Sequence, residues 1–269
     1  MSDTSLFGTR HLVLIALSFA MIVGLIFVTK KWTVKKCAKA MLIVGIISEI
    51  VKIFFYINAN EDTHGGVLPK TDLPFHLCSI QILLVLIVNI TANEMLRRMV
   101  LSFMMPSGFF GGIAAILIAT GSARSTVVIG LQYFLYHIAL TVFALKLMTD
   151  KDMKWRAADL LSCLKFLLIM MFCAFYINSI VYDGVSNINF MYVVGPPQEG
   201  LPFLNKDHGW LVYIAHYASL IVICVSACYV KAVITTIREK KVLAQGEGVH
   251  GTATGEDGLS VQEEVAFTE

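Results

Sequence analysis

One cysteine and three histidines stand out because each lies within a long apolar stretch: His76, Cys78, His137 and His216. A cysteine sulfur beside a general base can attack an ester carbonyl and hold the acyl group as a thioester. His76 and Cys78 are two residues apart, so on a regular helix they point to different faces. A base for Cys78 must then come from another helix, and both His137 and His216 lie at a suitable depth. A helix amino terminus favours negative charge on the sulfur, whereas apolar surroundings oppose it.

Other polar residues lie at a similar level of the chain. Glu49 and Lys52 are three apart, so they share a helix face and can pair, either as a polar floor or proton relay or as an ion pair that ties helices together. Three amide side chains are candidates to stabilise an oxyanion or contact a substrate: Gln81, Gln132 and Asn189. Asn189 and Tyr192 belong to a connection before the last helix that is rich in apolar residues. It is expected to cover the polar cluster as a lid or to lie at the interface.

The elements that carry these residues are apolar and long. Seven stretches each approach the roughly 20 residues that cross a bilayer: Leu12–Val28, Ala40–Asn58, Leu73–Asn89, Met99–Ile118, Val127–Met148, Asp159–Val181 and Trp210–Ala232. Hydrophobic residues make up 57% of the chain, charged residues 15%, and the mean hydropathy is +0.74. The sequence therefore predicts an all-α polytopic membrane protein, a seven-transmembrane-helix bundle. Residues 1–241 form the membrane domain, and 242–269 are expected to be a disordered cytoplasmic tail.

The basic residues are distributed unevenly between alternate connections. Fifteen Lys and Arg residues fall on one side of the seven stretches and four on the other. The positive-inside rule then predicts an outside amino terminus and a cytoplasmic carboxyl terminus. With this orientation the polar cluster lies in the outer half of the membrane. The third helix is expected to begin near Pro74, capped by Thr71 or Asp72.

The segment Leu73-Pro74-Phe75-His76-Leu77-Cys78-Ser79 resembles a signature of the YwaF family of bacterial integral membrane proteins. Asn189-Phe190-Met191-Tyr192 followed by Pro196-Pro197 resembles that family's connection before the last helix. The likeness extends from about Leu12 to Lys241, and the family is related to the animal transmembrane protein 164 acyltransferases. It implies that Cys78 accepts an acyl group, that His137 is the catalytic histidine, and that the partner is a membrane phospholipid or lysophospholipid. Phe75, Gly195 and Pro196 depart from the usual pattern, which affects expected headgroup or acceptor contacts.

Two classes of function follow from these residues. The first is a lipid acyltransferase or transacylase in the cell membrane, the bacterial plasma membrane by the resemblance, in which Cys78 takes an acyl chain and His137 moves the proton. The alternative is an ion or small-solute transporter or a membrane sensor whose path is lined by Glu49, Lys52, His76, His137 and His216. The inner half offers few polar residues to continue such a path.

Other partners and cofactors are not expected. No phosphate-binding glycine loop or dinucleotide fingerprint is present, so no cofactor is predicted. A metal site is predicted only if helices three, five and seven meet around one centre. A net charge of +2 gives no reason to expect a nucleic-acid partner. The six cysteines lie within the apolar stretches or in a basic connection, so no disulfide framework is predicted.

Overall fold

The computed structural model describes residues 5–58, 68–197 and 204–250, and this part of the chain is helical without β-strands. Its α-helices are α1 (Thr9–Thr29), α2 (Val34–Ile57), α3 (Leu77–Ile90), α4 (Glu94–Leu117), α5 (Gly121–Ser125), α6 (Val127–Thr149), α7 (Ala157–Val181) and α8 (Trp210–His250). Two 3₁₀ turns, η1 (Lys70–Asp72) and η2 (Phe190–Tyr192), lie in the connections. Six helices, α1, α2, α4, α6, α7 and α8, are long and apolar enough to cross a membrane. The multi-pass helical fold is thereby confirmed.

The third stretch departs from the expectation of seven full spans. Helix α3 has 14 residues, about 21 Å of rise, which is less than a hydrocarbon core of about 30 Å. Thr71 and Asp72 lie in η1 and do not cap α3; His76 is the N-cap residue. Leu73 is extended, as the residue before a proline tends to be. The predicted start near Pro74 was therefore wrong, because the aromatic rings of Phe75 and His76 pack on Phe190 instead of continuing a helix.

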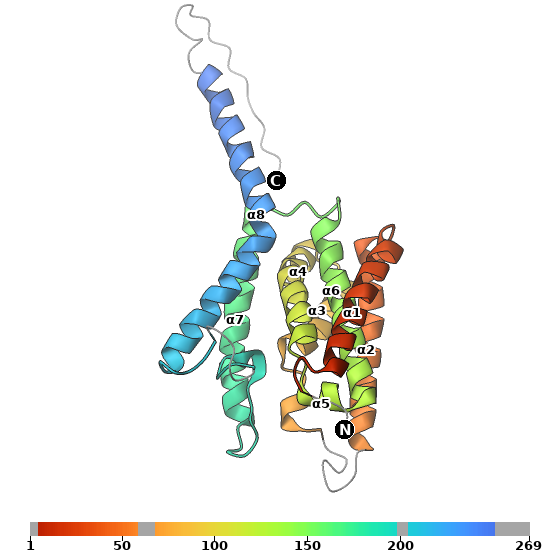
Figure 1. Ribbon diagram of the computed structural model, residues 1–269. Helices are drawn as coiled ribbons and strands as arrows, with labels where there is room; N and C mark the ends of the chain where they lie inside the picture. Colours follow the sequence, from red (N-terminus) through yellow and green to blue (C-terminus); the bar gives the residue numbers. More distant parts are fainter. Residues whose placement is uncertain (1–4, 59–67, 198–203, 251–269) are drawn as a thin grey trace, which may run out of the picture.

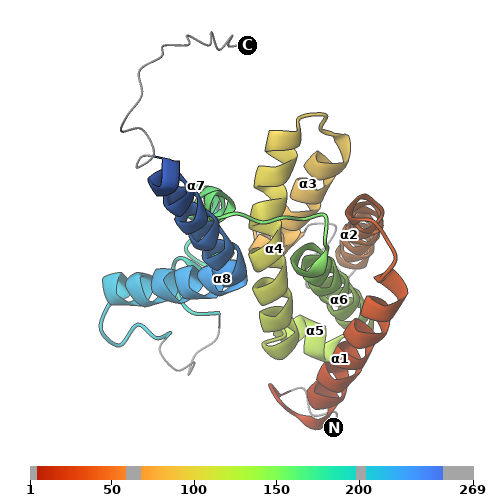
Figure 2. The ribbon, with the colours of Figure 1, turned by 90° about the horizontal axis from the view of Figure 1, so that it is seen from above.

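Helices α4 and α6 form the centre of the molecule. Helices α1 and α2 pack on α6, and α3 lies between α2 and α4, while α7 and α8 form a pair that joins the bundle through α4 (Figure 1 and Figure 2). The close approach of α4 to α6 depends on small residues, since Gly108 and Gly112 face the α6 side chains Leu140 and Thr141. The apolar core extends through these contacts, with Phe103 of α4 against Phe166 of α7.

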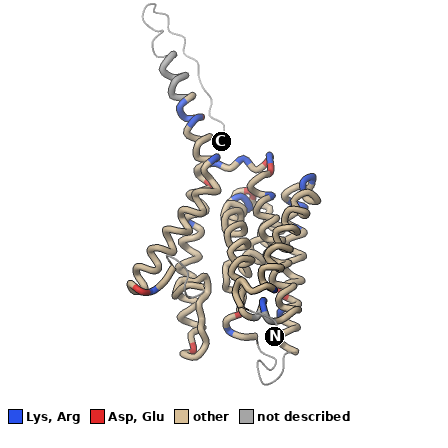
Figure 3. Tube along the Cα trace, in the orientation of Figure 1, with Lys and Arg blue, Asp and Glu red and all other residues tan. Residues whose placement is uncertain are grey.

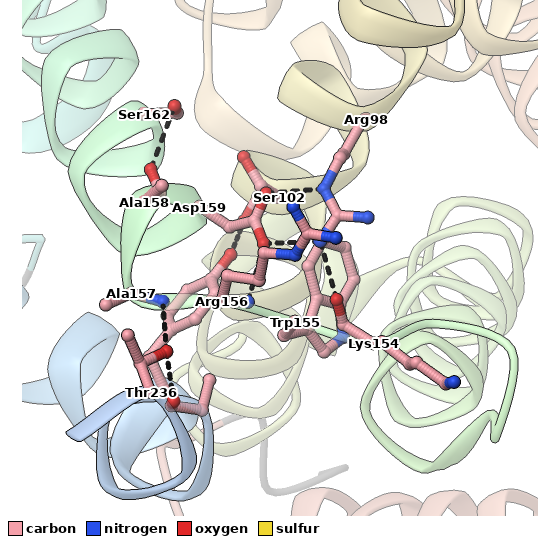
Figure 4. A network of polar contacts seen from close by, with 12 residues as sticks. Arg98, Ser102, Lys154, Trp155, Arg156, Ala157, Ala158, Asp159, Ser162 and Thr236 are labelled. Carbon is pink, nitrogen blue, oxygen red and sulfur yellow. Dashed lines mark hydrogen bonds and ion pairs between the residues drawn. The ribbon is translucent and has the colours of Figure 1, made fainter. Parts of the chain in front are cut away.

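A polar network fastens the α7–α8 pair to α4 (Figure 4). The Arg98 guanidinium donates two hydrogen bonds to the Asp159 carboxylate, at 2.7 and 2.6 Å, and a third to the Lys154 carbonyl. Asp159 also accepts from the Arg156 backbone N–H, which caps the start of α7. On α8, the Tyr229 hydroxyl donates to the Ser102 carbonyl at 2.6 Å. These bonds fix the start of α7 and the middle of α8 against the bundle.

The charges of the described residues divide between the two ends of the bundle (Figure 3). Lys and Arg gather at the α1–α2, α3–α4 and α6–α7 connections and on the stretch of α8 that contains Arg238, Lys240 and Lys241. The opposite end carries the start of α3 and the η2 connection. Helix α8 continues through His250, beyond the predicted domain boundary at Val242. Residues 251–269 lie outside the described residues, so the disordered tail stays a prediction.

Candidate functional site

Cys78 is the second residue of α3, close to an uncapped helix amino terminus. The first intrahelical bond of α3 runs from the Ile80 N–H to the His76 carbonyl, and His76 makes no side-chain cap. The N–H groups of the preceding residues are therefore free of helical partners, as at every helix start. Cys78 and its neighbour Ser79 lie in this first turn, where backbone N–H groups lack helical acceptors. Because α3 starts late, backbone N–H groups beside Cys78 stay free, whereas a longer helix would use them in its own hydrogen bonds.

His137, on α6, is held in one tautomer. Its Nδ1 lies 2.7 Å from the Tyr133 carbonyl oxygen, and a carbonyl only accepts, so Nδ1 carries the proton. Its side chain is buried, with 3% of the residue exposed. Among the described residues Nε2 has no hydrogen-bond partner. A buried imidazole whose unprotonated nitrogen is unoccupied has the form of a general base awaiting a substrate proton.

Two tyrosines of α6 pack beside His137, and one of them bonds the start of α3. The Tyr136 hydroxyl donates to the Cys78 carbonyl oxygen, and the Tyr136 ring lies edge-on to His137, with ring centroids 5.3 Å apart. The Tyr133 ring lies 4.2 Å from the His137 ring, and its hydroxyl donates to the Ala115 carbonyl of α4. Tyr136 therefore joins the helix that carries the histidine directly to the residue that carries the thiol.

The connection between α7 and α8 packs over the start of α3. The rings of Phe190 and Tyr192 lie 5.1 and 5.8 Å from the His76 ring. Burial raises the pKa of Tyr192 to about 12, and the charge of the Cys78 sulfur adds to this shift. Met191 and Tyr192 adopt positive φ values of 55° and 56°, which side-chain-bearing residues rarely do.

The strained turn is held by bonds from both neighbouring helices. On α7, Asn178 donates to the Phe190 carbonyl at 3.1 Å and accepts from its N–H at 2.7 Å. On α8, the Tyr213 and Tyr217 hydroxyls donate to the Tyr192 and Met191 carbonyls. Asn189 braces the turn itself through Gly195 and Val194, so its described bonds are structural.

An exposed ion pair ties this connection to the segment before α3. Lys70 lies 3.0 Å from the Asp183 carboxylate. The N–H groups of Ser186 and Val185, followed by Lys70, hold the pKa of Asp183 well below its usual range. Protonating Asp183 in strong acid removes the acceptor for all three groups. The connection is therefore anchored to α3 at its outer edge as well as through its rings.

The remaining predicted residues make hydrogen bonds or ion pairs within the bundle. Lys52 contacts the Glu49 carboxylate at 2.8 Å and donates to the Asp72 carbonyl, so the pair tethers the segment before α3 to α2. Gln132 donates to the Ser48 hydroxyl at 2.5 Å. Gln81 is fully buried and donates to the Ser107 hydroxyl at 2.8 Å, while its Oε1 has no partner among the described residues.

His216 does not join this cluster. It is exposed on α8, whereas Tyr213 and Tyr217 on either side of it turn toward η2. The described residues hold no group of three His, Cys, Asp or Glu side chains that could bind a metal ion. His216 is therefore not buried with His137 in this structure, and its role as a base stays a prediction.

Sequence reasoning missed the residues that position the site. Tyr133, Tyr136 and Thr141 recur with His137 at helical spacing on one face of α6, a signal that the sequence does contain. Ser48 and Ser107 give no such signal, because a single serine in an apolar helix more often bonds its own backbone.

Gly112 of α4 lies against the backbone of the α6 turn that carries His137. A Cβ there would lie 2.3 Å from Thr141 Oγ1 and 3.1 Å from the His137 carbonyl oxygen. Gly112→Ala is expected to lower the free energy of unfolding by about 1–2 kcal/mol, measured by reversible SDS unfolding in mixed micelles, because overpacking outweighs the helix-propensity gain.

Gly111→Ala is the matched control for that substitution. Its Cβ would meet only Leu77 Cδ2, at an ordinary 3.8 Å, so it should unfold like the parent or slightly later. Adding Thr141→Ala to Gly112→Ala removes the closer clash and should restore part of the loss. Equal unfolding of the Gly111 and Gly112 variants would contradict the close contact.

Taken together, the fold and site define a multi-pass helical membrane protein in which Tyr136, next to the buried His137 on α6, bonds the Cys78 carbonyl of α3. The family model of the TMEM164 family matches residues 6–229, so the chain belongs to this family. No curated protein and no solved structure matches the chain. The match bears out the transmembrane protein 164 resemblance, while the bacterial YwaF label stays a prediction.

Proposed function

We propose that the protein transfers acyl chains between membrane phospholipids, with Cys78 as nucleophile and His137 as general base. The observation that carries the proposal is the buried Nε2 of His137, which has no partner in the described part of the chain and lies one residue from the tyrosine that bonds the Cys78 carbonyl. An imidazole fixed in this tautomer can accept a thiol proton without rearranging. Membership in the TMEM164 family agrees with the assignment of the cysteine.

The reaction then proceeds in two balanced halves. His137 Nε2 takes the Cys78 proton as the sulfur attacks an ester carbonyl carbon; the ester C–O bond breaks and the leaving lysolipid oxygen receives the proton from the imidazolium. In the second half Nε2 takes a proton from an acceptor hydroxyl, that oxygen attacks the thioester carbonyl, and the C–S bond breaks. The departing sulfur recovers the proton.

Donors for the oxyanion come from the start of α3 in this proposal. The free backbone N–H groups at a helix amino terminus suit a developing negative charge. Gln81, one turn after Cys78, has its amide engaged by Ser107, so the backbone is the better candidate. Asn189 is used within its own connection and is not proposed as an oxyanion donor.

We also propose how the chain lies in the membrane. Helix α3 and the extended segment before it form a seventh crossing, since non-helical backbone is tolerated at membrane depth where protein covers it, as the η2 connection covers His76. The basic end then faces the cytoplasm, with the amino terminus outside, in a cell membrane. This orientation puts Cys78 near the outer headgroups, close to lipid ester groups.

A conduit gains no support from the described residues. Lys52 and Glu49 hold the segment before α3, and His216 faces away from the cluster, so the polar groups do not line one continuous path. The Glu49–Lys52 pair is better explained as a support for the approach to Cys78.

Trapping the acyl-enzyme tests the proposal. Purified protein is incubated with phospholipid carrying a labelled acyl chain, without acceptor, quenched in acid and analysed by peptide mass spectrometry. The peptide with Cys78 is expected to gain the acyl mass and to lose it with hydroxylamine, which cleaves thioesters. Cys173, exposed on α7, is the internal control and should stay unmodified. An unmodified Cys78, or equal labelling of both cysteines, would contradict the assignment of Cys78 as the nucleophile.

A further inference from the structure

A second candidate site lies at the basic end of the bundle, away from Cys78. A hollow of about 380 Å³ opens between the start of α2, the end of α3, the start of α4 and the α6–α7 connection. Lys35, Arg97 and Arg98 line it together with apolar side chains that include Val34 and Val88. Its volume falls in the range of about 300–1,000 Å³ that small-molecule sites occupy.

Both arginines have N–H groups that make no hydrogen bond within the described residues. Arg97 donates through Nε to the Val88 carbonyl, through Nη2 to the Thr91 carbonyl and through Nη1 to Glu94. Arg98 uses Nε and Nη2, so among the described residues Nη1 has no partner. A guanidinium has five N–H groups. Each arginine is thus fixed in place by some of its N–H groups while two others are left for a ligand.

The charge of the lining is positive. Lys35 is exposed and makes no ion pair within the described part of the chain. Glu94 is the one carboxylate among the described lining residues, and its side chain is 79% exposed, so water screens it. With Asp159, which pairs with Arg98 from outside the lining, the three cations face two carboxylates, and the remaining net positive charge favours an anionic ligand.

Helix orientation adds to this preference. Helices α2 and α4, of 24 residues each, both begin at this end, so the positive ends of their dipoles lie beside the hollow. The opposing carboxyl terminus of α3 is covered, because Arg97 takes the Val88 and Thr91 carbonyls. The electrostatic potential at the hollow is therefore positive, and both the helix dipoles and the side chains contribute to it.

The apolar wall identifies the class of anion. Ala38 and Leu101 continue the wall formed by Val34 and Val88. A free phosphate gains nothing from such a wall, whereas a lipid places its phosphate among cations and its glycerol and upper chain carbons on apolar side chains. We propose that this hollow binds the headgroup phosphate of an anionic phospholipid in the leaflet at the basic end.

Lys35→Glu tests the site without disturbing the arginine bonds. Native mass spectrometry of the full chain in detergent compares dioleoyl phosphatidylglycerol with dioleoyl phosphatidylcholine. In about 0.5 M ammonium acetate the Debye length falls below about 5 Å, so only close charges act. The parent is expected to bind the anionic lipid at least about fivefold more tightly than the zwitterionic one, and Lys35→Glu to lose that preference.

Lys39→Glu is the matched control, with the same charge change one turn further along α2 at a residue that does not line the hollow. It should keep the preference for the anionic lipid. Equal losses in both variants would mean that the general basic field attracts the lipid, and would overturn the site. Displacement of the lipid by an equal concentration of inorganic phosphate would overturn the lipid as ligand.

Discussion

Replacing His137 with asparagine is expected to slow acyl transfer by about 10²–10⁴-fold while leaving the fold intact. The asparagine removes the base nitrogen but can still donate to the Tyr133 carbonyl. Asn89 and Asn178 already donate to carbonyls four residues earlier on their own helices, each at 2.7 Å. Single-turnover measurement of acyl-enzyme formation, followed by transfer to a lysolipid acceptor, should show that both halves slow, since in the proposed mechanism Nε2 takes a proton in each.

His216→Asn is the matched control for the base. It changes the other histidine that the sequence offered, on a helix where the side chain is exposed. Its rate should equal that of the parent. A His137→Asn variant that keeps more than half of the parental rate would remove His137 from the mechanism. A slow His216→Asn variant would instead show that α8 rearranges to deliver its histidine.

Much of the fold could be predicted because apolar length is a strong signal. The end of α7 at Val181 and the starts of α6 and α8 agree with the predicted stretches. The start of α3 could not be read in the same way. Its local sequence permits a helix from Pro74, and only the rings of a connection more than a hundred residues later decide that Phe75 and His76 stay outside it.

The site was predictable in its residue types but not in its partners. The spacing of His76 and Cys78 excluded a direct pair on one helix, and the resemblance selected His137. Neither indicates that Tyr136 bonds the Cys78 carbonyl, or that His216 faces outward, because a helix whose polar residues are few can be rotated without changing its apolar pattern. Those contacts depend on how separate helices pack, which tertiary structure alone determines.

Breaking the ion pair between Arg98 and Asp159 is expected to lower the stability of the fold strongly. Asp159→Ala leaves a guanidinium without its carboxylate and removes the acceptor that caps α7 at Arg156. Asp159 is largely buried, with 9% of its side chain exposed, while Arg98 retains some access to water. The free energy of unfolding is expected to fall by about 2–4 kcal/mol in SDS mixed micelles, below the upper range for fully buried pairs.

Glu94→Ala supplies the contrast, because it removes an exposed carboxylate from the neighbouring arginine, Arg97. That loss should stay within about 0–1 kcal/mol. A double-mutant cycle with Arg98→Ala should return a coupling energy of at least about 1 kcal/mol. If the two carboxylate variants unfold alike, the network does not hold α7 to α4. If they differ as expected, weakening this distant contact should also slow acyl transfer, because the α7–α8 pair carries the turn that packs on His76.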